Sequence, residues 1–396
     1  MNYNRQVKND STTPVRVACA IVFIVFAFLW LYCFQTDLLA FTQHVYSHGQ
    51  THYRPLIGTL IIILTLSMLQ WGVYRLLPLR MRTHALTYFP SMLLLALLTS
   101  AGPDAGGGFA LLTWLYILLA LALWLAVAIA ALRLQDIESR TPSGLFSRRM
   151  LVNMFLMAAM MLGVAAVANT NAVFHYGLHA EKALINGNDE KALRVGQRSL
   201  ETDAHLTMVR IYALSRHGLL GERLFEYPLV PSSEAMLPTD SATAMLMYPT
   251  DSLYRHLGAK PRGKMKVMDY LRAILRSGQA TAAARDYLLC GYLIDKDLDA
   301  FAREIGRYYK VDTNLPLYYR QALVLYNHRR SNPVVEYHDA VLDADYADMQ
   351  QQEATYKEPS ERMGKMMENY ANSYWYYYDY VNPSVHTASS SAMFKN

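Results

Sequence analysis

The sequence predicts an all-α protein in which a five-helix transmembrane bundle precedes an extracytoplasmic α-solenoid of helical hairpins. Two observations lead to this fold class. The 396 residues are 53% hydrophobic and only 17% charged, whereas a soluble globular protein has about 25% charged residues. The charges are also unevenly divided, because residues 1–168 hold 5 acidic residues and residues 169–396 hold 27. A membrane domain followed by a water-soluble domain accounts for both observations.

Five apolar runs in residues 1–168 are long enough to cross a lipid bilayer, which requires about 17–25 residues of helix. The third run is the weakest, because it is short and carries Pro90. No ionisable residue lies well inside a run, which argues against a pump, a proton-coupled transporter or a voltage sensor. The runs cover residues 17–34, 56–73, 85–101, 109–132 and 150–168.

Basic residues are concentrated on one side of this predicted domain. Ten lie in the N-terminal tail and in the second and fourth connecting loops, whereas the first and third loops hold only Arg54. Lys and Arg are retained on the cytoplasmic side, so we expect a cytoplasmic N-terminus and, after five spans, an extracytoplasmic tail. In a bacterium with two membranes, the protein would lie in the inner membrane with its tail in the periplasm. The ten residues are Arg5, Lys8, Arg16, Arg75, Arg80, Arg82, Arg133, Arg140, Arg148 and Arg149.

Residues 169–396 show apolar residues at three- and four-residue spacing, which predicts helices. Helices of 11 to about 20 residues joined by short turns are typical of an α-solenoid. Residues 227–263 interrupt the pattern with five prolines, and form either a structured connecting segment or a mobile binding loop. The expected helices cover residues 172–186, 190–200, 204–216, 264–276, 281–294, 297–309, 315–329, 333–351 and 359–380.

One stretch of the tail, residues 181–200, resembles the turn and second helix of a tetratricopeptide (TPR) repeat. Gly187 matches the glycine between the helices, and Ala192 matches the small residue of the second helix. The sequence departs from the pattern at Gly196, where a large aromatic is usual, and at Ala204, where a proline is usual. The layout as a whole resembles bacterial multi-pass envelope proteins of uncharacterised function. The resemblance implies a TPR-like tail and a place in the cell envelope, not a chemistry.

Three histidines in the first external loop are candidate metal ligands. His44, His48 and His52 stand four residues apart and Asp37 lies seven residues before His44, so on a continuous helix all four would share one face, as zinc or copper ligands do. Gly49 interrupts such a helix. The alternative is that these histidines are ordinary polar residues at the membrane interface, which we favour.

Tyrosine is unusually frequent, at 29 residues. The run over residues 374–380 is too dense for one buried stripe, so some rings must face outward, where Tyr and Trp suit a surface that is partly apolar. Tyr376, Tyr377 and Tyr380 are therefore candidate partner-binding residues. Partner docking, glycan stacking and contact with the membrane surface all fit the run, and so does a last helix that caps the solenoid.

The sequence carries no phosphate-binding loop, zinc-protease helix or nucleophile elbow, so we predict no catalytic residue and no cofactor. Nucleic acid is not an expected partner, because the basic excess lies beside the apolar runs. We therefore expect a non-enzymatic, membrane-anchored scaffold whose helical tail binds a protein or peptide. The alternative is an integral-membrane enzyme, such as a glycan or lipid transferase, which would use Asp37 and the external histidines.

Overall fold

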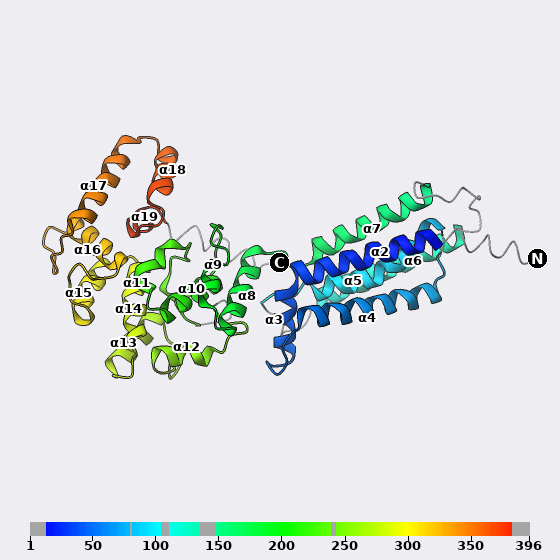
Figure 1. Cartoon of the computed structure of the whole chain (residues 1–396), viewed down its shortest axis with the longest axis horizontal. Coiled ribbons are helices and arrows are strands. Elements are labelled where there is room, and N and C mark those ends of the chain that lie inside the picture. Colours follow the sequence, from blue (N-terminus) through cyan, green and yellow to red (C-terminus); the bar gives the residue numbers. More distant parts are fainter. Residues whose placement is uncertain (1–12, 80, 104–110, 135–146, 239–242, 382–396) are drawn as a thin grey trace, which may run out of the picture. The chain divides into compact units, whose positions relative to one another are not determined.

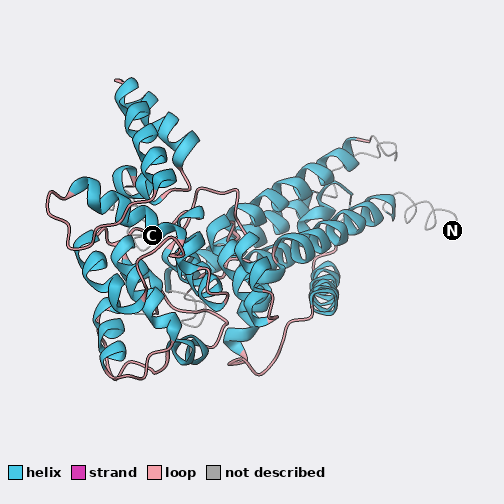
Figure 2. Ribbon diagram, turned by 60° about the vertical axis from the view of Figure 1, so that its left-hand side comes forward, coloured by secondary structure: helices cyan, strands magenta, loops and turns pink. Residues whose placement is uncertain are grey.

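The computed structural model describes residues 13–79, 81–103, 111–134, 147–238 and 243–381. These residues form helices and loops, and no strand occurs among them (Figure 2). The predicted all-α class is confirmed. The chain divides into two compact units, which are unit 1 over Met1–Asn171 and unit 2 over Ala172–Asn396.

Unit 1 contains four helices that are long and apolar enough to cross a membrane, counted over the described residues. Each coincides with one of the predicted runs, so a membrane protein is supported. The first is α2, which ends in a π-helical turn, η1, and is followed by the shorter helix α3 (Figure 1). The elements are α2 Thr13–Leu29, η1 Trp30–Phe34, α3 Thr36–Tyr46, α4 Pro55–Leu76, α6 Leu111–Leu134 and α7 Arg148–Val167.

The expected third span over residues 85–101 is not one α-helix. It consists of a 3-10 helix, η2 (Met81–Tyr88), followed by a ten-residue α-helix, α5 (Phe89–Leu98). Pro90 lies in the first turn of α5, where its missing amide hydrogen and fixed φ begin a helix rather than continue one. Both segments pack against α7 and α4, and they bury Tyr88, Met92 and Leu95.

Polar side chains of the neighbouring spans satisfy the backbone and side chains of this irregular segment. Asn153 of α7 accepts a hydrogen bond from the amide of Ala85 at 2.7 Å. Gln70 of α4 donates to the hydroxyl of Thr87 at 2.9 Å, and Ser91 donates to the carbonyl of Leu66 at 2.8 Å. Without water, each backbone group left unpaired in a membrane would be costly, so these polar residues stabilise the 3-10 geometry.

Unit 2 is a stack of short helices, most of which lie where the sequence predicts them. The largest differences are at α9, which ends at Arg194, at α17, which begins at Ala340, and over residues 359–380, which form two helices because Ser373 caps the second. The elements are α8 Ala172–Ile185, α9 Asp189–Arg194, α10 Ala204–Arg216, α11 Leu220–Arg223, η5 Leu224–Glu226, η6 Ser233–Met236, α12 Thr250–Leu257, α13 Val267–Arg276, α14 Ala282–Ile294, α15 Leu298–Tyr308, α16 Leu317–Arg329, α17 Ala340–Thr355, α18 Pro359–Tyr370 and α19 Tyr374–Tyr380.

The region that resembles a TPR repeat departs from two helices of similar length. Gly196 has φ of +63°, and a Cβ there would lie 2.9 Å from the ring of Tyr176. A large aromatic side chain therefore has no room at this position, and α9 stops two residues earlier. Helix α8 packs against both α9 and α10.

The proline-rich segment 227–263 is largely integrated into unit 2. It contains η6 and α12, and it buries Tyr227, Met236 and Leu253 in the core. Residues 239–242 lie outside the described part. This integration agrees with a structured connecting segment better than with a mobile loop.

A buried carboxylate fastens the middle of this segment. Glu181 of α8 is 0% exposed and accepts hydrogen bonds from the amides of three consecutive residues, 246–248, at 2.7, 2.6 and 2.8 Å. His205 of α10 donates to the same carboxylate through Nε2 at 2.5 Å. We call these four contacts of the carboxylate the Glu181 latch.

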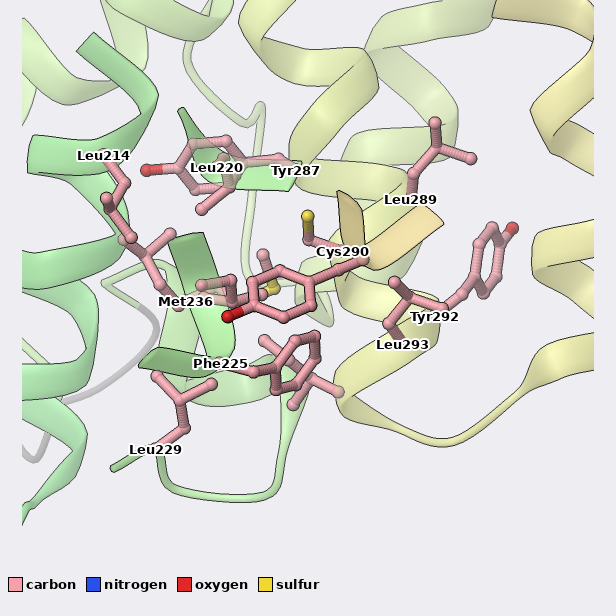
Figure 3. Close-up of a cluster of buried hydrophobic side chains, with 14 of the residues drawn as sticks. Leu214, Leu220, Phe225, Leu229, Met236, Tyr287, Leu289, Cys290, Tyr292 and Leu293 are labelled. Atoms are coloured by element: carbon pink, nitrogen blue, oxygen red, sulfur yellow. The ribbon is translucent and has the colours of Figure 1, made fainter. Parts of the chain in front are cut away.

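The core of unit 2 is rich in aromatic side chains (Figure 3). Phe225 lies beside the rings of Tyr318, Tyr374 and Tyr377, with centroids 5.0, 5.1 and 4.6 Å apart. Cys290 is a buried free thiol, and burial raises its pKa well above the ordinary value. Such a thiol is a packing residue rather than a nucleophile.

Candidate functional site

Among the described residues, the structure does not gather His44, His48 and His52 into a metal site. Helix α3 ends at Tyr46, His48 has φ of +49° and Gly49 has φ of +76°, so the three histidines do not share a helical face. Among the described residues, no group of three His, Cys, Asp or Glu side chains is placed to hold a metal ion. Asp37 lies in the first turn of α3, whereas His48 and His52 come after the other end of this helix.

The aromatic run of residues 374–380 forms α19, and one face of this helix belongs to the core. The hydroxyl of Tyr374 donates to the carbonyl of Leu293 at 3.2 Å, and the indole of Trp375 donates to the carbonyl of Gln321 at 2.9 Å. Tyr377 is 5% exposed and donates to the carbonyl of Ile294 at 2.8 Å. Tyr377 therefore has little surface for a partner.

The opposite face of α19 carries the remaining two candidate residues. Tyr376 and Tyr380 are half-buried, and their rings stack with centroids 5.3 Å apart and planes at 11°. The hydroxyl of Tyr380 donates to Glu353 of α17 at 2.7 Å. On the adjoining helix α18, Met363 and Met367 are 49% and 37% exposed and lie one turn apart. Helices α18 and α19 pack against each other, and we call their partly exposed side chains Tyr376, Tyr380, Met363 and Met367 the C-terminal face.

Charged side chains from distant parts of the chain hold the end of α19 in place. Lys296, in the left-handed conformation with φ of +60°, donates to the carbonyls of Tyr378 at 2.8 Å and Val381 at 2.5 Å. A cation at a helix C-terminus is favourable. Arg329 pairs with Asp379, and its guanidinium lies 5.0 Å from the ring centre of Tyr378.

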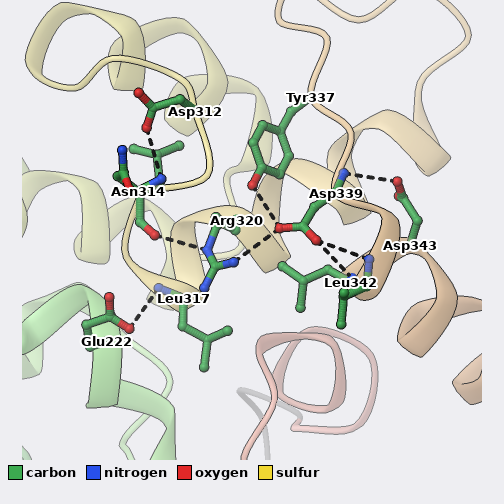
Figure 4. A network of polar contacts seen from close by, with 11 residues as sticks. Glu222, Asp312, Asn314, Leu317, Arg320, Tyr337, Asp339, Leu342 and Asp343 are labelled. Atoms are coloured by element: carbon green, nitrogen blue, oxygen red, sulfur yellow. Dashed lines mark hydrogen bonds and ion pairs between the residues drawn. The ribbon is translucent and has the colours of Figure 1, made fainter.

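Helix α17, which supplies Glu353, is itself anchored by a polar network (Figure 4). Asp339 caps α17 by accepting from the amides of Val341 and Leu342 at 3.2 and 3.3 Å. The same carboxylate accepts from Arg320 at 3.1 Å and from Tyr337 at 3.2 Å. Although burial alone would raise it, these hydrogen bonds hold the pKa of Asp339 below its ordinary value. The network fixes the start of α17 to α16.

A buried carboxylate in the core is the other polar cluster that resembles a site. Asp286 accepts from the hydroxyls of Tyr309 at 2.6 Å and Tyr319 at 2.9 Å, and Tyr319 lies 3.5 Å from the Cys290 sulfur. Burial raises the pKa of Asp286 although both tyrosines oppose the change. The carboxylate is thus engaged by two donors within the protein, so we assign this cluster to packing of α14, α15 and α16.

The C-terminal face can bind but has no evident means of covalent chemistry. Its groups are two stacked phenol rings, two thioethers and a carboxylate, and no nucleophile with an adjacent base is found there among the described residues. Sequence reasoning identified the tyrosines but missed Lys296 and Glu353, which position them. No local signal marks either residue, because their contacts bridge 82 and 27 residues of sequence.

The C-terminal part of unit 2 matches a known protein family. Residues 260–381, which include the C-terminal face, match the model of a family of unknown function, DUF6057. The match covers less than a third of the chain, and residues 1–259 lie outside it. No curated protein and no solved structure matches the chain. The most informative similarity is therefore that unit 2 from α13 to α19 resembles members of DUF6057.

Proposed function

We propose that the protein is a non-enzymatic, membrane-anchored scaffold that binds a protein or peptide through the C-terminal face. The observation that carries this proposal is the stacked pair Tyr376 and Tyr380, held on a helix whose other face is locked into the core. Aromatic and methionine side chains are enriched at protein interfaces. A rigid support also lowers the entropy cost of binding.

A solenoid-like organisation of unit 2 supports the same function. Each helix from α13 to α17 packs against the next helix in sequence, as helices of repeat proteins do, and α16 also packs against α11 and α19. Repeat domains commonly present extended surfaces to peptides. The proposal therefore keeps a TPR-like architecture for this part of the chain, with irregular pairs at α8 and α9.

The proposal also includes five membrane crossings, with η2 and α5 forming the third. At rises of about 2.0 and 1.5 Å per residue, their 8 and 10 residues extend about 31 Å, close to the ~30 Å hydrocarbon core. With only four crossings, the arginine-rich loop between α6 and α7 would lie outside, against the positive-inside rule. Five crossings keep it in the cytoplasm and place unit 2 outside, in the periplasm of a two-membrane bacterium.

Photo-crosslinking in the native membrane tests the binding function. A benzophenone amino acid at Met363 of the full chain should give a discrete adduct, and the same probe at exposed Leu200 should not. The adduct should disappear with Tyr376→Ser and Tyr380→Ser combined.

A matched pair of substitutions controls for general damage to unit 2. Tyr176→Ser and Tyr308→Ser combined remove two half-buried rings elsewhere and should keep the adduct. An adduct that survives loss of Tyr376 and Tyr380 but is lost in this control would contradict binding at the C-terminal face.

A further inference from the structure

The loop between α12 and α13 is the most basic segment of unit 2. Residues 260–266 contain Lys260, Arg262, Lys264 and Lys266. No acidic residue occurs between Ser252 and Met268. Residues 251–276 carry a formal net charge of +5, whereas the rest of residues 169–396 carries −6. We call residues 260–266 the basic loop.

Side chains of the basic loop are exposed and mostly lack an ion-pair partner. Residues 262–266 are all exposed. Lys260 pairs with Asp251, but within the described residues no ion pair is found for Arg262, Lys264 or Lys266. The carboxylate of Glu234 accepts from the amide of Val267, directly after the loop, at 3.3 Å. Three cations are therefore available to a ligand.

The backbone on both sides of the basic loop is fastened to unit 2. The hydroxyl of Tyr270 donates to the carbonyl of Ala259 at 2.5 Å, and the amide of Thr281 donates to the carbonyl of Leu257 at 3.0 Å. Gly258 has φ of +128°, and a Cβ there would lie 2.0 Å from the carbonyl oxygen of Gln279. The loop is thus presented from a defined position, which limits the entropy lost on binding.

We propose that the basic loop binds the phosphate groups of anionic phospholipids at the surface of the membrane that holds the chain. Met265 is 41% exposed among the cations, and cations around an exposed apolar side chain suit the lipid interface. Only four residues separate the end of α7 at Val167 from the start of α8 at Ala172, so unit 2 stays tethered to a membrane span. An acidic partner protein would have to compete with the lipid of this membrane for the basic loop.

Accessibility of position 265 in nanodiscs tests the proposal. Full-length protein carrying Cys33→Ser and Met265→Cys is reconstituted into phosphatidylcholine alone or with 30% phosphatidylglycerol, and the rate of labelling by a water-soluble maleimide is measured. Labelling should be several-fold slower in the anionic nanodisc, and 1 M NaCl should remove the difference because the Debye length falls to about 3 Å.

Charge substitutions assign the protection to the loop. Each basic residue at an anionic surface contributes about fivefold to binding. Arg262→Gln, Lys264→Gln and Lys266→Gln together should therefore weaken lipid binding about 100-fold and abolish the protection of position 265 from labelling. Three exposed cations elsewhere in unit 2 provide the matched control, Arg198→Gln, Arg303→Gln and Lys310→Gln, which should keep it.

Two results would overturn the lipid assignment. One is equal labelling in neutral and anionic nanodiscs. The other is protection that depends on two copies sharing a nanodisc, whatever the lipid charge. The second result would mean that the loop contacts an acidic protein surface, such as α17 of another copy, which has four acidic residues and no basic one.

Discussion

Removal of the charge of Glu181 should loosen the segment that crosses the middle of unit 2. In the substitution Glu181→Gln, one amide oxygen replaces a carboxylate that accepts from three backbone amides and from His205. The new NH₂ group faces donors, and His205 is left without its counter-charge. Breaking a buried charge pair by removing one partner costs about 3–5 kcal/mol.

The expected loss can be measured in two ways. For a unit of this size, each kcal/mol lowers Tm by about 2–4 °C, so Glu181→Gln should lower the Tm of unit 2 by ~6–20 °C. Hydrogen exchange should accelerate most at the amides of residues 246–248, because these lose their acceptor. The matched control is Glu201→Gln, at an exposed position, and should change neither. Unchanged Tm and unchanged exchange in Glu181→Gln would refute the role of the latch.

The latch should also depend on pH in a defined direction. Burial by itself would raise the pKa of Glu181, but the hydrogen bond and charge of His205 and the backbone amides hold it below the ordinary 4.5. Burial would lower the pKa of His205, but Glu181 raises it above 6.5. The carboxylate therefore stabilises unit 2 above pH 4.5, and this contribution to stability is lost as pH falls through the lowered pKa of Glu181. The imidazolium stabilises it below pH 6.5, and this part is lost as pH rises through its raised pKa. Protection at residues 246–248 should be greatest between pH 4.5 and 6.5.

Three further predictions concern the core, the membrane unit and the topology. Tyr377→Ser should lower the free energy of unfolding by about 3–5 kcal/mol, as for other buried aromatics, and lower Tm by ~6–20 °C. Tyr376→Ser and Tyr380→Ser combined should lower Tm less. Equal shifts would mean that both faces of α19 are core. Asn153→Leu should leave the amide of Ala85 unpaired and cost about 1–3 kcal/mol, measured by unfolding in detergent mixtures, and no loss would mean that η2 is stable without it. A phosphatase fused to the C-terminus should be active only when exported, and one fused in the loop between α6 and α7 should be inactive; the reverse pattern would overturn five crossings or their orientation.

Most helices could be predicted because each depends on a local pattern. Helix α10 occupies the residues that its apolar spacing indicates, and four spans coincide with apolar runs. The segment over residues 85–101 was predicted less well, since a run of hydrophobic residues does not distinguish α from 3-10 geometry. The 3-10 segment depends on a hydrogen bond between Ala85 and Asn153, 68 residues apart. Such a tertiary contact leaves no periodic signal.

The sequence predicted only part of the candidate site. The density of tyrosine in residues 374–380 indicated that some rings face outward, but not which ones. The division between buried Tyr377 and half-buried Tyr376 depends on where α19 begins, and Ser373 sets that point by accepting from the amide of Tyr376. The histidine hypothesis required a helix to continue past Tyr46, and Gly49 was the visible signal against it.

The two proposed surfaces of unit 2 are compatible with simultaneous use. In Figure 1, α12 and α13 lie toward the lower edge of unit 2, whereas α17 and α18 lie toward its upper edge. If the basic loop rests on lipid headgroups, the C-terminal face is directed away from them. The acidic character of α17 favours the same orientation, because anionic headgroups repel it. Opposite charge at the two edges would thus orient the scaffold, leaving Tyr376 and Tyr380 open to a partner in solution.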